Sequence, residues 1–131
     1  MQGSVREPAV AGQFYPGTRE GLLKELEECF TAGFGAGELP KVDEGGPRRI
    51  VGLVSPHAGY MYSGGAAARG FFALAKDGRP DLFVIIGPSH RVDTRVALDP
   101  SDGWRTPLGV ARVDGDFLRA LAGATDVVRF E

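Results

Sequence analysis

The two histidines of this 131-residue chain are its most informative residues for chemistry. His57 follows the apolar run 50–54 by three residues, and His90 follows the apolar run 82–86 by four. In an open α/β sheet, ligands bind outside the carboxyl ends of the strands. If both runs form neighbouring parallel strands, the two imidazoles converge on one point. Because imidazole suits iron, copper, zinc and nickel, this spacing indicates a divalent metal site.

A metal site built on two histidines needs a further ligand, and the sequence leaves its identity open. A carboxylate would complete the two-histidine, one-carboxylate arrangement of non-heme iron sites. Asp93, Asp99 and Asp102 follow the second run, and nothing in the sequence selects one of them. A thiolate is the alternative ligand. Cys29, however, falls on the apolar stripe of a predicted helix, where a cysteine packs as a small hydrophobic residue.

Polar residues beside the histidines are candidates for lining the same site. Tyr60, Tyr62 and Ser63 lie just after the first histidine, and Ser89 lies just before the second. Their hydroxyl groups are suited to hydrogen-bonding an oxygen species bound at the site. The alternative interpretation makes them ordinary turn and packing residues, and the sequence does not separate the two.

Ser89 also raises a hydrolase alternative. Residues 87–91 read Gly-Pro-Ser-His-Arg, which partly matches the G-x-S-x-G nucleophile elbow. Arg91 replaces the last glycine of that motif. A general base must face the serine hydroxyl across space, and an adjacent histidine does not arrange this. We therefore disfavour the hydrolase interpretation.

The elements that would position the histidines are two strands joined by a helix. The runs 50–54 and 82–86 are short, apolar and β-branched, which is typical of buried strands. Residues 64–76 are rich in alanine and predict a helix, which the turn formers at 77–80 end. A strand, a helix and a strand within about 40 residues form a βαβ unit with parallel strands and a right-handed crossover.

The first fifty residues predict one further helix between two loops. Residues 6–17 predict an extended arm or loop, and residues 31–49 form a glycine-rich loop. Thr18 is expected to cap the helix between them. The apolar stripe of that helix contains Leu22, Leu23, Leu26, Cys29 and Phe30.

The region after the second histidine predicts shorter elements. Residues 92–98 predict a third strand, and residues 104–109 predict a turn-rich loop. Asp114 or Asp116 is expected to cap a short helix, and a further strand begins at Val127.

Composition limits the classes of protein to which the chain can belong. Apolar residues make up 43% of it, which predicts a packed core, and the net charge of −2 comes from scattered residues. The sequence therefore shows no basic stripe for nucleic acid and no polybasic cluster for a membrane surface. It also lacks an apolar stretch of about 20 residues for a membrane span. A single cysteine, together with a start that lacks a secretory signal, predicts a cytoplasmic protein.

Four motifs in the same order and spacing resemble the MEMO family. These motifs are Ala-Gly-Gln-Phe-Tyr-Pro at 11–16, Pro-His-Ala-Gly-Tyr at 56–60, Gly-Pro-Ser-His at 87–90 and Thr-Pro-Leu-Gly at 106–109. Bacterial and archaeal members of that family are also called AmmeMemoRadiSam system protein B. The resemblance implies a three-layer α/β/α sandwich similar to the catalytic subunit of class III extradiol dioxygenases. Because family members are about twice as long, residues 1–131 are expected to form the N-terminal half of a single domain.

The same resemblance implies a function and its ligands. It makes His57 and His90 metal ligands, and it places the third ligand, a cysteine, far toward the C-terminus of the family protein. The expected function is that of a metal-dependent redox protein or dioxygenase-like enzyme, with iron or copper as the cofactor. The alternative is a non-catalytic binding module, which uses the same pocket for a protein or peptide partner.

Overall fold

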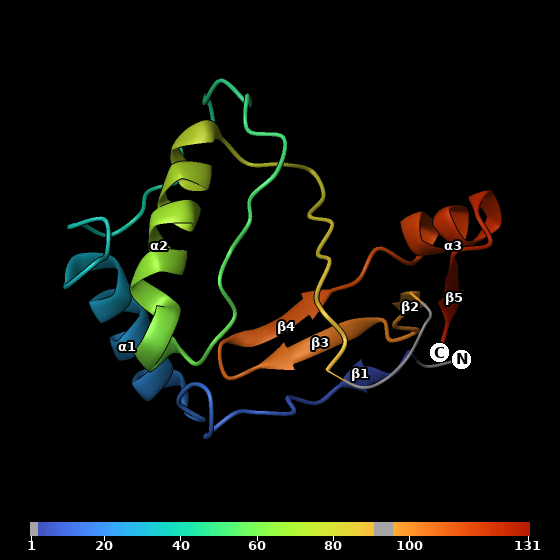
Figure 1. Ribbon diagram of the computed structural model, residues 1–131, viewed down its shortest axis with the longest axis horizontal. Helices are drawn as coiled ribbons and strands as arrows, with labels where there is room; N and C mark the ends of the chain where they lie inside the picture. The colour runs from blue at the N-terminus through green and yellow to red at the C-terminus, as the bar shows by residue number, and fades with distance from the viewer. Residues whose placement is uncertain (1–2, 91–95) are drawn as a thin grey trace. The chain divides into compact units, whose positions relative to one another are not determined.

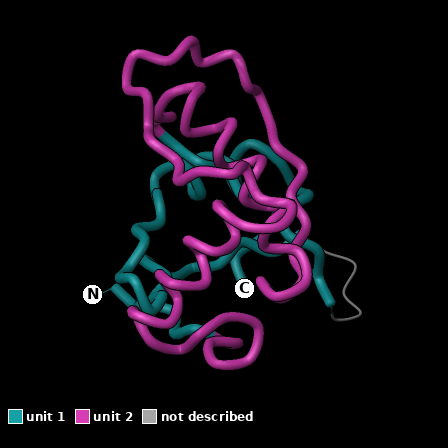
Figure 2. The backbone as a smooth tube through the Cα atoms, turned by 90° about the vertical axis from the view of Figure 1, so that its left-hand side faces the viewer, with its two compact units in different colours: residues 1–8, 82–131 teal, residues 9–81 magenta. Residues whose placement is uncertain are grey.

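The computed structural model describes residues 3–90 and 96–131 of the chain, which divide into two compact units (Figure 2). One unit comprises residues 9–81, and the other comprises residues 1–8 and 82–131. The described residues form a mixed α/β structure, which confirms the predicted class (Figure 1). The helices are α1 (Arg19–Thr31), α2 (Tyr60–Asp77) and α3 (Gly115–Ala124). The strands are β1 (Val5–Arg6), β2 (Val96–Leu98), β3 (Gly103–Thr106), β4 (Gly109–Arg112) and β5 (Val128–Phe130).

The unit of residues 9–81 is built on the packing of α1 against α2. Thr18 caps α1 as predicted, because its hydroxyl accepts the N–H of Gly21 at 3.1 Å. Small residues let the two helices approach closely. A Cβ added at Gly64 would overlap Cys29 Sγ, and Ala68 is buried one turn further along α2.

The segment before α2 runs back along that helix and is anchored at the helix's C-terminal end (Figure 1). The Asp77 carboxylate accepts the N–H groups of Arg49 and Ile50, each at 2.9 Å. Farther along, the side chain of Leu53 lies where a Cβ on Gly70 of α2 would have to be placed. The start of the run 50–54 is thereby fixed against the helix.

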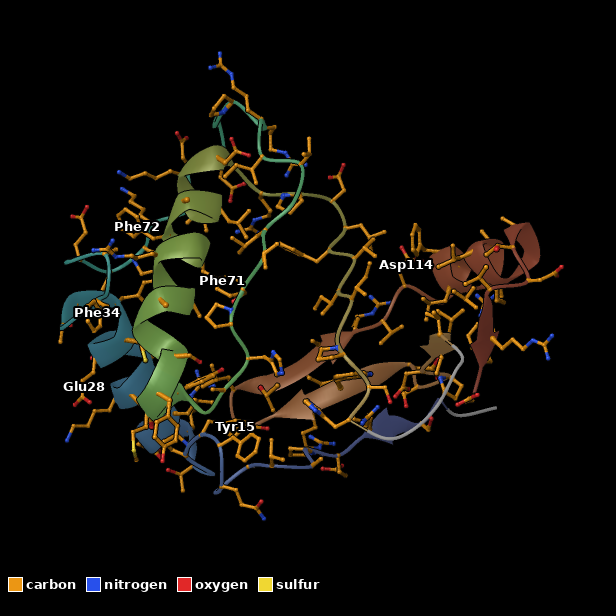
Figure 3. All side chains as sticks on the ribbon, in the orientation of Figure 1. Tyr15, Glu28, Phe34, Phe71, Phe72 and Asp114 are labelled. Atoms are coloured by element: carbon orange, nitrogen blue, oxygen red, sulfur yellow. The ribbon has the colours of Figure 1, made fainter. Side chains whose placement is uncertain are left out.

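The other unit contains two small sheets. In the first, β1 pairs with β3 in parallel and β3 pairs with β4 as an antiparallel hairpin. In the second, β2 and β5 pair in parallel. The predicted turn-rich loop 104–109 is therefore mostly strand, with its turn confined to residues 107–108. Asp114 caps α3 by accepting the N–H of Phe117 at 2.9 Å, which confirms one of the two predicted caps (Figure 3).

The two strands predicted before the histidines are not formed. Residues 50–54 and 82–86 have no regular secondary structure, and all ten residues are exposed. The predicted βαβ unit is therefore wrong for this structure, although its helix is present. Apolar β-branched residues favour a strand only where a neighbouring strand pairs the backbone and covers the side chains. The third predicted strand is confirmed for residues 96–98, and residues 92–95 lie outside the described residues.

The packed core predicted from composition is also much smaller than expected. Among the described residues, the buried apolar side chains are those of Leu22, Ala68 and Leu98. None of the described helices combines the length and the apolar character that a membrane span requires.

Candidate functional site

His57 lies on the exposed segment that leads into α2. The segment is fixed just beyond the histidine, where the N–H of Tyr60 donates to the carbonyl of Phe14 at 3.0 Å. The hydroxyl of Ser63 donates to the carbonyl of Ala58 at 3.2 Å and ties the first turn of α2 back to the same segment. The backbone beside His57 is therefore held on its C-terminal side, while the histidine itself stays accessible to solvent.

Tyr60 and Tyr62 have different surroundings although only one residue separates them. Tyr60 is half-buried, and its ring lies 5.7 Å from the ring of Tyr15. Burial raises the pKa of Tyr60 above its ordinary value, and the neighbouring Tyr15 adds to this shift. The side chain of Tyr62 is 83% exposed. Tyr60 and Ser63 thus have defined packing roles, and their predicted role in lining a metal pocket stays a prediction.

An open hollow of about 220 Å³ lies near the start of α2. Its lining consists of Gly12, Gln13, Phe14, Tyr15, Pro16, Glu25 and Met61. The sequence predicted no function for these residues, although residues 11–16 form one of the four motifs that resemble the family. The sequence feature that could have indicated the hollow is the concentration of aromatic residues and turn formers in residues 6–17.

His90 and Ser89 lie in the unit of residues 1–8 and 82–131, at the end of an exposed segment without regular secondary structure. The strand that a nucleophile elbow requires before its serine is not formed by residues 82–86. His57 belongs to the unit of residues 9–81. The predicted convergence of the two imidazoles on one metal therefore stays a prediction.

Among the carboxylates considered as a third ligand, Asp99 has another role in the described structure. Asp99 forms an ion pair with Arg6 at 2.5 Å and accepts the N–H of Ser101 at 2.7 Å. Partial burial raises the pKa of Asp99, but the hydrogen bonds from Ser101 and the Arg6 guanidinium outweigh it, so the pKa lies below its ordinary value. The carboxylate of Asp102 lies where a side chain on Gly3 would be placed. Asp93 lies outside the described residues.

Cys29 has the packing role predicted for it. Its thiol lies on the face of α1 that meets α2, with Sγ 4.0 Å from the carbonyl oxygen of Tyr60. Burial raises the pKa of the Cys29 thiol, and Glu25 and Glu28 raise it further. Because the thiolate is the form that binds metal, these surroundings make Cys29 a poor ligand.

The donor set in the described residues is incomplete for a metal site. Two imidazoles are the right ligand type for iron or copper. Residues 3–90 and 96–131 contain no group of three histidine, cysteine, aspartate or glutamate side chains placed to hold a metal ion. The described residues therefore fit the expected metal in ligand chemistry but not in ligand number.

Comparison with known proteins places the chain in a family. The model of the family described as "Memo-like protein" matches residues 6–131. A MEMO1 family protein of Methanopyrus kandleri is 46% identical over 117 residues, which cover 88% of this chain and 41% of that protein. A MEMO1 family protein of Thermotoga neapolitana is 44% identical over 123 residues, which cover 92% of this chain and 44% of that protein. The chain thus spans less than half the length of these relatives. From the match over residues 6–131 and these identities, we conclude that the chain belongs to the Memo-like family.

Proposed function

We propose that the chain supplies His57 and His90 as two imidazole ligands to a divalent metal site in a cytoplasmic redox protein of the Memo-like family. The observation that carries the proposal is the matched position of the two histidines. Each follows an apolar run by three or four residues, and each lies on an exposed segment. Pro56 and Pro88 restrict the backbone close to the histidines, which favours a defined direction for each imidazole.

The proposed metal is iron or copper, because both accept imidazole ligands and both support redox chemistry. When bound, such an ion would supply one-electron and dioxygen chemistry, as it does in dioxygenase-like enzymes. The third ligand comes from outside the described residues. It is either Asp93 or a residue in the part of the family protein that lies outside the alignment with this chain. The family resemblance implies a cysteine in that part. Tyr60, Tyr62, Ser63 and Ser89 are proposed to line the site within a completed three-layer α/β/α sandwich.

Metal content tests this proposal directly. Elemental mass spectrometry is applied to the complete product of the gene that encodes this chain and to its His57→Ala/His90→Ala variant. Near-stoichiometric iron or copper that disappears in the variant is the expected result. Asp99→Asn is the matched control, since the ion pair with Arg6 gives Asp99 a structural role, and it should keep its metal. Equal trace metal in the parent and the double variant would reject the proposal.

A binding module without catalysis is the second candidate function. The exposure of apolar side chains in residues 50–54 and 82–86 favours it, since exposed apolar surface marks interaction sites. Oxygen uptake by the iron-loaded complete protein with catechols separates the two functions. Uptake that vanishes in His57→Ala identifies the enzyme. Capture of a peptide partner that survives loss of both histidines, without oxygen uptake, identifies the module.

A further inference from the structure

Tyr15 and Tyr60 bring two phenol rings together from segments that are far apart in the sequence. Their ring centroids lie 5.7 Å apart, and the ring planes are tilted by 33°. Tyr15 belongs to the segment of residues 6–17, and Tyr60 is the first residue of α2. Both residues lie in the unit of residues 9–81, so the separation of the rings is set within one compact unit.

The backbone holds the two rings at this separation. The N–H of Tyr60 donates to the carbonyl of Phe14 at 3.0 Å, which joins the residue next to Tyr15 directly to the start of α2. Residues 10–15 form a tight turn, because the N–H of Gly12 donates to the carbonyl of Tyr15 at 2.8 Å and the N–H of Phe14 donates to the carbonyl of Val10 at 3.0 Å. A reaction between the two rings therefore needs little further loss of conformational entropy.

The surroundings of the pair are open to a small reagent. Tyr15 and Tyr60 are both half-buried. Tyr15 also lines the open hollow of about 220 Å³, together with Met61. A small oxidant thus has a path to Tyr15 through the hollow, whereas the half-buried rings are less accessible to a tyrosine of a second molecule.

Tyrosine oxidation is the reaction that this arrangement favours. Loss of one electron and one proton converts a phenol to a phenoxyl radical, whose unpaired electron is shared with the ring carbons beside the hydroxyl. Two such radicals couple by forming a carbon–carbon bond between those ring carbons, and the hydrogen atoms on these carbons move to the oxygens and restore both hydroxyls. The net change is the transfer of two electrons to two equivalents of a one-electron oxidant and the release of two protons to water.

We infer that Tyr15 and Tyr60 form an intramolecular dityrosine cross-link when a one-electron oxidant reaches the chain. Holding the rings side by side replaces an encounter between molecules by a step within one molecule, which raises the effective concentration of one ring at the other. Tyr62, the third tyrosine of residues 1–131, is 83% exposed and lies two residues after Tyr60 in α2, where side chains do not face each other. This inference does not depend on whether a metal binds at His57.

The cross-link fastens residues 6–17 to the start of α2. It closes the chain between residues 15 and 60, and a closed loop lowers the conformational entropy of the unfolded state, as in a disulfide. The cross-linked protein should therefore unfold at a higher urea concentration than the untreated protein. Since Tyr60 follows His57 by three residues, the cross-link also restrains the segment on which this candidate ligand lies.

Oxidation by azidyl radicals tests the inference, because this radical is a small one-electron oxidant of phenols. The radicals are generated by γ-radiolysis of an azide solution that contains the complete product of the gene that encodes this chain, at low protein concentration. The monomer is then isolated by size exclusion and digested. Mass spectrometry should find the peptides of Tyr15 and Tyr60 joined with the loss of two hydrogen atoms, together with the fluorescence of dityrosine.

Phenylalanine substitutions identify the two rings. Tyr15→Phe and Tyr60→Phe keep the ring but lack the phenolic hydroxyl, so each should lower the dityrosine content of the monomer at least about threefold. Oxidation of either variant should also leave the urea midpoint without the increase expected for the parent protein. Tyr62→Phe is the matched control, and it should keep both the dityrosine content and the increase in the urea midpoint.

Three outcomes would overturn the inference. The first is an oxidised monomer without the joined peptides of Tyr15 and Tyr60. The second is a main cross-link that contains Tyr62 in place of either residue. The third is a yield of cross-link that rises with protein concentration, which would place the coupled rings in two different copies. Peptide mapping of the parent protein decides the first two outcomes without any substitution.

Discussion

Gly64 lies where α1 and α2 pack, and its replacement by alanine is expected to destabilise the chain. An added Cβ would overlap Cys29 Sγ and would lie 3.5 Å from Cys29 Cβ and 3.4 Å from Tyr60 Cβ. Helix propensity alone favours alanine over glycine by about 1 kcal/mol. Overpacking costs about 1–3 kcal/mol, and the short cysteine side chain between two helices has little room to move. We therefore expect Gly64→Ala to lower the free energy of unfolding by about 1 kcal/mol.

Two further variants isolate the cause. Gly65, the next residue of α2, has no atom closer than 3.4 Å to an added Cβ, which is ordinary van der Waals contact. Gly65→Ala should therefore raise the free energy of unfolding by about 0.5–1 kcal/mol through helix propensity. Cys29→Ala removes the overlapping sulfur. In that background, Gly64→Ala should be neutral or stabilising, which corresponds to a coupling of about 1–2 kcal/mol between the two sites.

Urea unfolding followed by far-ultraviolet circular dichroism measures all of these free energies. The decisive comparison is the effect of Gly64→Ala with and without the cysteine sulfur. If Gly64→Ala stabilises the chain as much as Gly65→Ala does, the helices are not packed as closely as described. If it destabilises the Cys29→Ala background equally, the overlap with sulfur is not the cause.

Three other perturbations test contacts away from that helix pair. Asp77→Asn should lower stability near neutral pH, because two backbone N–H groups hold the pKa of the carboxylate below its ordinary value. That contribution is present above the unfolded pKa of about 3.9 and is lost as pH falls through the lower folded pKa, so unfolding curves of variant and parent should converge in acid. Thr18→Ala should cost about 1 kcal/mol in urea unfolding, whereas Thr18→Ser should cost only a few tenths; equal losses would contradict capping. Arg6→Ala should cost about 1 kcal/mol or less, since it removes a partly exposed ion pair to Asp99 and a stacking contact with Trp104, and the loss should shrink in high salt if the ion pair dominates.

Helices and their caps were predictable because their signals are local. Thr18 and Asp114 both precede an apolar periodic segment, and both accept a backbone N–H in the first turn of the helix that follows. The alanine-rich helix was also predicted, although α2 begins at Tyr60 rather than at Gly64. Where a helix begins depends on how the segment before it is held. Here the N–H of Tyr60 donates to the carbonyl of Phe14, a contact between distant residues that the sequence does not reveal.

Strands were predicted less well because pairing is not a local property. Residues 82–86 have a stronger strand composition than β3, yet β3 forms a strand because β1 and β4 lie on its two sides. The hairpin at residues 103–112 looked like a loop because its tryptophan, arginine and glycine residues show no clear apolar alternation. The candidate metal ligands depend on the same missing information, since the convergence of His57 and His90 requires the runs before them to be neighbours in a sheet.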